Sequence, residues 1–244
     1  MRENFNPAKE CENIIKWIRQ YFKNQPSAKG AIIGISGGKD SLIASKLLVE
    51  ALGKERVFGV LIPNGVQKDI GDSLKVVDIL GINHKIVNIE KAYNGLLEGI
   101  VEKNLSIDAK INIPPRLRMT TLYAIAMSMH YRVCGTGNKS EGFVGYTTKW
   151  GDNAFDFNPI GDLTTEEVIA VGDSLGLPYE LVHKTPSDGL SGQSDEEKLG
   201  FTYKQINDYI EKGSCGDAEV DRCIRLKHEY NTHKRELPLK YEVI

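Results

Sequence analysis

One short segment of the chain concentrates the groups needed to hold a phosphate chain. It reads Gly34-Ile-Ser-Gly-Gly-Lys-Asp-Ser41 and lies between a short apolar run and an amphipathic pattern of helical period. Backbone N–H groups of a glycine-rich turn at a helix N-terminus form an anion-binding nest, and the helix dipole strengthens it. Ser36 and Ser41 can add hydroxyl donors, and Asp40 can hold a magnesium ion. The segment therefore predicts a binding site for nucleotide phosphates.

This segment differs from the common P-loop of nucleotide triphosphatases. That motif requires a glycine five positions before Gly38, where Ile33 stands, and a serine or threonine where Asp40 stands. The plainer alternative is a tight strand-to-helix turn with a Ser or Asp cap and no ligand.

Strands and helices alternate around this segment. The apolar run 31–35, bounded by glycines, predicts a buried strand. The further expected elements are helices over 8–22, 40–52, 71–80, 91–103 and 117–131, and strands over 57–63, 84–89 and 131–134. Such alternation predicts an α/β fold: a doubly wound, mainly parallel sheet flanked by helices. Ligands of such sheets bind beyond the carboxyl ends of the strands, at a topological switch point.

The pattern changes in the last third of the chain. We expect a loop over 142–163, a helix over 164–176, a Gly/Ser/Asp-rich loop over 185–200 and helical structure over 203–231. We therefore predict a single domain over 1–244, with a sheet core at about 28–141 and a loop and helical C-terminal part at about 142–244.

Composition excludes several classes of protein. The chain has 244 residues, of which 41% are hydrophobic, so a sizeable core is expected and wholesale disorder is not. Lys and Arg number 31 against 33 Asp and Glu, which gives no reason to expect nucleic-acid binding. The longest apolar run, 122–127, is far too short to span a membrane. The four cysteines form no C-x-x-C pair and no secretion signal is evident, so we expect free thiols in a reducing cytoplasm.

Further motifs accompany the phosphate loop. They are Asn112-Ile-Pro-Pro-Arg-Leu-Arg-Met119, Gly135-Thr136 with Glu141, Thr148-Lys-Trp-Gly-Asp152, Lys184-Thr-Pro-Ser187, Gln193-Ser-Asp-Glu196 with Leu199-Gly200, and His233-Lys-Arg235. The loop itself resembles the S-G-G-x-D-S pyrophosphate loop of the ATP pyrophosphatase superfamily. The order of the other motifs, from about residue 10 to 240, resembles the ammonia-dependent NAD synthetase family. That resemblance implies an adenine-nucleotide α-hydrolase-like fold and a ligase. Such a ligase uses ATP to adenylate the nicotinate carboxylate of deamido-NAD, and ammonia then displaces AMP to give NAD.

The resemblance also implies roles for particular residues. Asp40 and Glu141 would bind magnesium and, with Ser36 and Ser41, serve catalysis. The ATP contacts would be Gly34, Ile35, Ser36, Gly37, Gly38, Lys39, Asp40, Ser41, Thr136, Thr165 and Ser187. The deamido-NAD contacts would be Arg116, Lys149, Asp156, His233 and Lys234, with Arg118 two residues beyond Arg116. Family members are homodimers, so we expect one here.

The sequence departs from the family pattern at one important place. Thr165 stands where the family commonly has a lysine in the ATP site, so contact with ATP there is open, and Lys184 or Lys39 can cover part of the charge. No separate amidase domain is evident, which favours free ammonia as the nitrogen donor, supplied directly or by a separate protein. The loop 185–200 is the expected lid over the acyl-adenylate.

Three alternatives stay open at this stage. Two are enzymes of the same superfamily: a GMP-synthetase-type amidating domain and a tRNA-thiolating enzyme. The latter usually needs paired cysteines and a basic face. The third is a non-catalytic nucleotide sensor, which only Thr165 supports.

Overall fold

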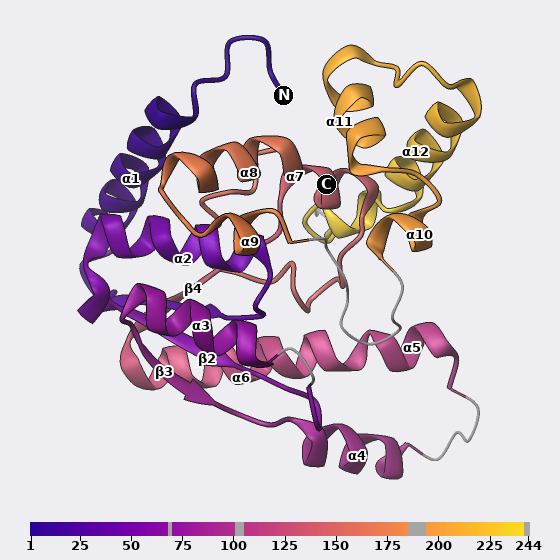
Figure 1. Ribbon diagram of the computed structural model, residues 1–244. Coiled ribbons are helices and arrows are strands. Elements are labelled where there is room, and N and C mark those ends of the chain that lie inside the picture. The colour runs from indigo at the N-terminus through magenta and orange to yellow at the C-terminus, as the bar shows by residue number, and fades with distance from the viewer. Residues whose placement is uncertain (68–69, 101–104, 185–193, 242–244) are drawn as a thin grey trace.

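Four parallel strands form the centre of the protein (Figure 1). The computed structural model describes residues 1–67, 70–100, 105–184 and 194–241. Its strands are β1 Gly30–Gly34, β2 Val57–Leu61, β3 Asn83–Ile86 and β4 Tyr131–Cys134, in the order β3-β2-β1-β4. All three pairings are parallel. The predicted α/β class and parallel sheet are confirmed.

Helices surround the sheet. Those before β4 are α1 Pro7–Lys23, α2 Lys39–Leu52, α3 Ile70–Leu80, α4 Glu90–Gly99, α5 Ile107–Ile111 and α6 Ile113–Met129. Those after it are α7 Lys139–Val144, α8 Thr165–Ser174, α9 Tyr179–Val182, α10 Asp195–Leu199, α11 Tyr203–Lys212 and α12 Ala218–Tyr230. Two short 3-10 turns, η1 Lys54–Arg56 and η2 Thr232–Lys234, complete the described elements. No helix in the described residues has the length and apolar character needed to cross a membrane.

The side-chain alternation of β1 separates two cores. Ala31 and Ile33 point to the face covered by α1, α2, α3 and α8, whereas Ile32 points to the face covered by α6. All three side chains are fully buried, as expected for a central strand covered on both sides. A third apolar cluster joins α7 to α10, α11 and α12 through residues such as Val144, Ile206 and Ile224. Each large side chain buried in these clusters contributes about 1.5–3 kcal/mol.

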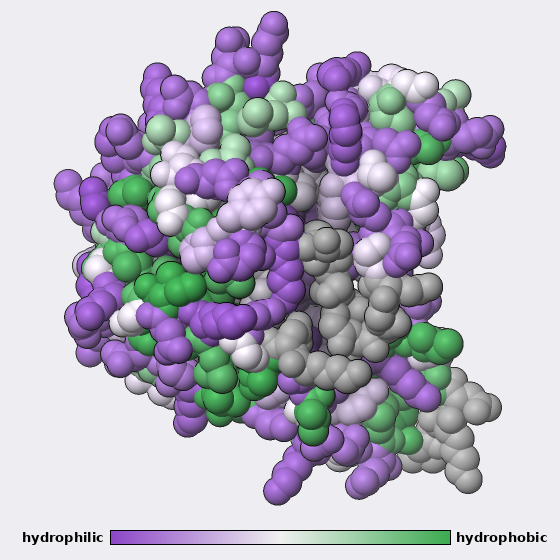
Figure 2. Space-filling view, viewed as in Figure 1, coloured by the Kyte–Doolittle hydropathy of each residue, from purple (hydrophilic) through white to green (hydrophobic). Residues whose placement is uncertain are grey.

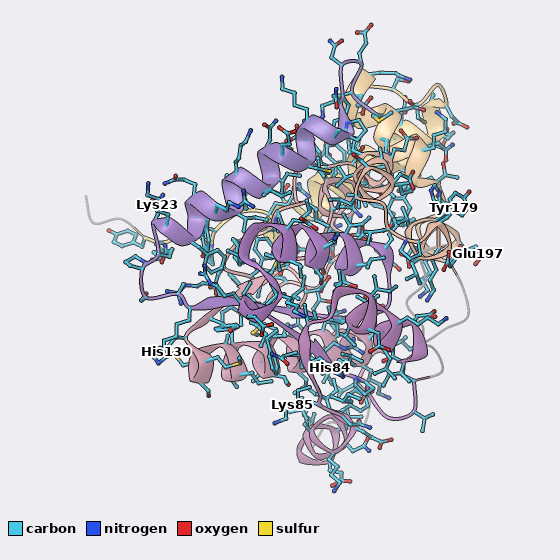
Figure 3. The ribbon with its side chains drawn as sticks, turned by 60° about the vertical axis from the view of Figure 1, so that its left-hand side comes forward. Lys23, His84, Lys85, His130, Tyr179 and Glu197 are labelled. Atoms are coloured by element: carbon cyan, nitrogen blue, oxygen red, sulfur yellow. The ribbon has the colours of Figure 1, made fainter. Side chains whose placement is uncertain are left out.

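The β3 edge of the sheet is open to solvent. Every residue of β3 is exposed, and its polar His84 and Lys85 lie at this outer edge (Figure 3). Charged residues on an edge strand oppose pairing with another chain. The face in Figure 2 is mostly hydrophilic, with separate apolar areas rather than one continuous patch.

Several expected boundaries were wrong for local reasons. The loop predicted from residue 142 begins later, because Asn138 and Glu141 form a capping box that starts α7 and outweighs Gly142. The helix predicted over 117–131 begins at Ile113, since proline is compatible with the first turn of a helix. The single helical stretch predicted over 203–231 is divided into α11 and α12, with Gly213 in the left-handed conformation at the C-cap of α11.

Other differences concern short elements. The helices α5 and α9 were not predicted, and Asp195–Leu199 is a helix within the predicted loop 185–200. Residues 185–193 of that loop, with the proposed lid and Ser187, lie outside the described residues, as do 101–104 at the end of the predicted helix 91–103. Among described residues after β4, only an isolated bridge from Phe157 to Cys134 extends the sheet.

An ion pair between an exposed arginine and a buried glutamate fixes the start of α8. The Arg2 guanidinium donates to Glu167 through Nε at 2.7 Å and Nη2 at 3.0 Å, and Glu167 is fully buried. Burial alone would raise the pKa of Glu167, but the hydrogen bonds from Arg2 and from the Thr164 backbone lower it. The pair therefore contributes stability above the ordinary glutamate pKa that is lost as the pH falls through the lowered folded-state pKa.

Removal of this arginine is expected to leave a buried carboxylate without its charged partner. We expect Arg2→Met to lower the free energy of unfolding by about 2–3 kcal/mol at pH 7, below the full cost of an enclosed pair because Arg2 is partly exposed. Urea unfolding measures the change. The double variant with Glu167→Gln should recover at least half of the loss, and equal losses in the single and double variants would contradict this account.

Candidate active site

The glycine-rich loop lies at the switch point of the sheet. The connection from β1 goes to β2 on one side, whereas β4 pairs with the other side of β1. The loop after β1 and residues 135–141 after β4 therefore start from neighbouring strand ends. Ligands of open parallel sheets bind at this position.

The loop is shaped by its own hydroxyls. Ser36 Oγ accepts a hydrogen bond from the Gly38 backbone N at 3.2 Å, and Ser41 Oγ donates to the Gly38 carbonyl at 3.0 Å. Gly37 has φ +78°, in the left-handed region that favours glycine. Ser36 is exposed and Ser41 is buried, so only the former has its side chain open to a ligand.

Glu141 comes from α7, which follows β4. Its Oε2 accepts from the Asn138 backbone N at 3.0 Å, and Asn138 Oδ1 accepts from the Glu141 backbone N at 3.0 Å. Burial and, secondarily, the charge of Asp40 raise the pKa of Glu141 from 4.5 to about 8. Glu141 is thus held in a fixed position within the electrostatic reach of Asp40.

The two carboxylates fit a hard cation. Asp40 Oδ1 is buried and has no hydrogen-bond partner, while its Oδ2 lies 3.3 Å from the Lys39 ammonium. An orphaned carboxylate oxygen, together with a second carboxylate within its electrostatic reach, offers oxygen donors of the kind that suit Mg²⁺. Among the described residues there is no group of three or more metal-ligating side chains, so the phosphates of a bound nucleotide would have to complete the coordination.

Thr165 lies in a buried hydrogen-bond network. It is buried at the start of α8, where its backbone N donates to Ser140 Oγ at 3.0 Å and its hydroxyl reaches Asn138 Oδ1 at 3.5 Å. Ser140 in turn donates to Asn207 of α11. Thr165 thus contacts Asn138, the N-cap residue of the helix α7 that carries Glu141. These hydrogen bonds join α8, α7 and α11 behind the site.

Lys39 and Lys184 were expected to supply part of the positive charge that Thr165 lacks. Of the two, Lys39 lies at the carboxylate of Asp40. Lys184 Nζ instead bonds Asp72 of α3 at 2.7 Å, and this bond, with one from Lys75, lowers the pKa of Asp72. The pair ties the segment after α9 to the helix beside the phosphate loop. Thr136 is half-buried in the turn after β4.

Three of the five expected dinucleotide residues surround one loop, 147–153. Arg116 Nε donates to the Lys149 carbonyl at 3.2 Å, and Lys234 Nζ donates to the carbonyls of Gly145 and Thr147 at 2.7 and 2.8 Å. Burial lowers the pKa of Lys234, and Asp152 partly offsets it. The Lys149 ammonium lies 5.5 Å from the centroid of the Trp150 ring.

The other two expected dinucleotide residues have different surroundings. His233 is exposed in η2, next to Lys234. Asp156 Oδ2 accepts from the Val133 backbone N of β4 at 2.8 Å, and its Oδ1 accepts from Tyr123 at 3.3 Å. These bonds give Asp156 a structural function that the sequence did not indicate.

Sequence reasoning also missed a polar cluster beside Glu141. Asp195 Oδ1 accepts from the Tyr146 hydroxyl at 3.1 Å, and its Oδ2 accepts from Tyr203 at 3.4 Å. Burial and then the charges of Glu141 and Asp195 raise the pKa of Tyr203. The motif that contains Asp195 was noted in the sequence, but its neighbours come from the segment after α7 and from α11 and could not be identified from spacing.

Arg118 is the more buried of the two arginines at the start of α6. Burial lowers the pKa of Arg118, and its Nε donates to the Ile62 carbonyl after β2 at 3.0 Å. This bond joins α6 to the carboxyl end of a neighbouring strand.

Fold and site together define a nucleotide-binding α/β protein with a phosphate loop and a carboxylate pair at its switch point. The family model for NAD synthase matches residues 10–238, and the chain belongs to this family. An NH(3)-dependent NAD(+) synthetase from Thermococcus sibiricus is 41% identical over 97% of this chain and 98% of the relative.

Solved structures give the same assignment of fold. The NMN synthetase from Francisella tularensis has a TM-score of 0.91 at 33% identity, covering 98% of this chain and all of that one. The NH3-dependent NAD synthetase from Campylobacter jejuni has a TM-score of 0.83 at 27% identity, with the same coverage.

Proposed function

We propose that this protein amidates deamido-NAD with ammonia, using ATP, and releases NAD, AMP and diphosphate. The observation that carries the proposal is the phosphate loop beside Asp40 and Glu141 at the switch point, in a chain of the NAD synthase family. The nicotinate carboxylate attacks the α-phosphorus and diphosphate leaves. Ammonia then attacks the acyl carbon of the adenylate, AMP leaves and a proton passes to solvent.

The residues of the chain contribute mainly position and charge. The loop 36–41 binds the β and γ phosphates through backbone N–H groups at the N-terminus of α2. Asp40 and Glu141 would hold Mg²⁺, which neutralises charge on the departing diphosphate. The substrate carboxylate is already a nucleophile, so no serine or cysteine nucleophile is needed.

The dinucleotide is proposed to bind at the loop 147–153. Lys149 lies in the loop 147–153, and Arg116 and Lys234 donate to the backbone carbonyls of Lys149 and Thr147 in the same loop. Such a group of cations suits the diphosphate bridge of a dinucleotide. We also propose that the protein is a cytoplasmic homodimer with one catalytic domain per chain. Its nitrogen donor is ammonia, taken up free or supplied by a separate protein.

A second candidate substrate has a specific observation behind it. The structure resembles an NMN synthetase at a TM-score of 0.91, so nicotinate mononucleotide is an alternative acid for the same two half-reactions. The chemistry at the carboxylate would be unchanged. Only the contacts with the adenylate half of the dinucleotide would be lost.

One assay decides between these substrates. Purified protein with ATP, Mg²⁺ and ammonium is given deamido-NAD, nicotinate mononucleotide or no acid, and AMP and the amide product are measured. We expect equal amounts of NAD and AMP, and a kcat/KM for deamido-NAD at least about tenfold above that for the mononucleotide, since extra phosphate contacts improve transition-state binding. A reversed ratio would assign the mononucleotide. Binding of ATP without AMP from any acid would support the sensor alternative.

A further inference from the structure

Lys39 is a charged side chain buried at an unfavourable position. It is the first residue of α2 and only 4% exposed. The helix dipole disfavours a cation in the first turn, and a buried ammonium requires a charged or hydrogen-bonding partner. Its contact with Asp40 Oδ2 at 3.3 Å supplies one. Lys39 is therefore part of the carboxylate site.

The oxygens of the two carboxylates have different partners. Asp40 uses Oδ2 for Lys39 and leaves Oδ1 buried and unpartnered, while Glu141 uses Oε2 for the capping box of α7. The free protein thus holds the Lys39 ammonium against Asp40, one of the two proposed metal ligands.

We infer that Lys39 is a built-in counter-ion that makes divalent-cation binding at Asp40 and Glu141 depend on bound nucleotide. This rests on the proposed function. Without nucleotide, the ammonium already balances one negative charge and repels a second cation. When triphosphate binds, its phosphates attract the ammonium and add oxygens for the metal. Metal then enters with the nucleotide and is held only weakly by the empty site.

The test measures metal binding without turnover. The thermal unfolding midpoint is followed against MgCl₂ concentration at constant ionic strength, first with no nucleotide and then with α,β-methylene-ATP. For Lys39→Met we expect the half-effective Mg²⁺ concentration without nucleotide to fall by about tenfold or more, because a nearby positive charge is removed. Lys39→Gln keeps a hydrogen-bond donor without the charge and should show the same fall. It replaces Lys39→Met in the test if Lys39→Met does not fold.

Two variants serve as controls. Lys39→Arg keeps the charge and should stay within about threefold of the wild type. Lys46→Met removes a lysine farther along the same helix, where Lys46 pairs with Glu50 at 2.6 Å, and should leave the Mg²⁺ midpoint unchanged.

The nucleotide dependence gives the second readout. In the wild type the half-effective Mg²⁺ concentration should be much higher without the analogue than with it. The ratio of these two concentrations should be at least about fivefold smaller in Lys39→Met and Lys39→Gln. Unchanged midpoints in both neutral variants, with a normal wild-type response, would overturn the role of Lys39 alone. If Mg²⁺ stabilised no variant with or without the analogue, the proposed metal site would fail as well.

Discussion

Replacing Glu141 with glutamine is expected to abolish most activity and at the same time stabilise the protein. The carboxylate is a proposed Mg²⁺ ligand, and the loss of such transition-state charge stabilisation lowers turnover by about 100- to 1,000-fold. Glutamine is compatible with the third position of a capping box, so the bond from the Asn138 backbone N can persist. The gain in stability comes from the removal of a partly buried negative charge within the electrostatic reach of Asp40.

The pH dependence has a definite sign. Burial and the Asp40 charge raise the folded-state pKa of Glu141 from 4.5 to about 8. Below 4.5 the group is protonated whether the chain is folded or not. Between 4.5 and about 8 the unfolded chain ionises first, so wild-type stability falls as the pH rises, and above about 8 the penalty is constant. Glu141→Gln should lack this fall and gain a few kcal/mol at pH 8.

The measurement is urea unfolding from pH 4.5 to 9 without metal, together with kcat at saturating Mg²⁺. Glu197→Gln is the matched control, because Glu197 occupies the same capping-box position in α10 but is exposed (Figure 3). It should change neither activity nor the pH profile of stability. A Glu141→Gln variant that is less stable than the wild type at pH 8 would contradict the assignment of an unfavourable charge at this position.

The sequence predicted the framework of the site better than its supporting contacts. The buried run at β1, the glycine turn and the helix pattern of α2 are local features, and together they placed Asp40 and the loop correctly at a strand end. The parallel-sheet pattern also predicted that a ligand would bind beyond the carboxyl ends of the strands, at a topological switch point. Both inferences need only periodicity and turn chemistry.

The contacts behind the site depend on segments far apart in the chain. Thr165 contacts Asn138, and Tyr203 contacts Asp195 beside Glu141, through helices whose packing no spacing rule specifies. A threonine where a lysine was expected therefore looked like a weakened ATP contact, whereas its described environment is a buried hydrogen-bond network. The burial of Lys39 was equally invisible, because a lysine in a polar loop reads as solvated.

Gly37→Ala is the substitution expected to damage the phosphate loop most. Gly37 has φ +78°, and a Cβ there would lie 3.0 Å from the Ser73 backbone N and 3.2 Å from the Asp72 Cβ. The side chain would therefore impose backbone strain and also displace the first turn of α3, whose Asp72 bonds Lys184. We expect a loss of about 2–4 kcal/mol in the free energy of unfolding and a fall of at least about 100-fold in kcat/KM for ATP.

Gly53→Ala separates backbone strain from packing. Gly53 has nearly the same φ, +80°, at the C-cap of α2, but nothing lies within 4 Å of its added Cβ. It should cost about 1–3 kcal/mol through backbone strain alone and leave the KM for ATP unchanged. Urea unfolding and initial-rate kinetics of both variants make the comparison. Gly53 combines its positive φ with ψ 149°, so its strain is at least that of a left-handed residue. The comparison therefore rests on the KM for ATP: a rise in Gly37→Ala alone would show that packing against α3 positions the phosphate loop, whereas unchanged KM values in both variants would show that it does not.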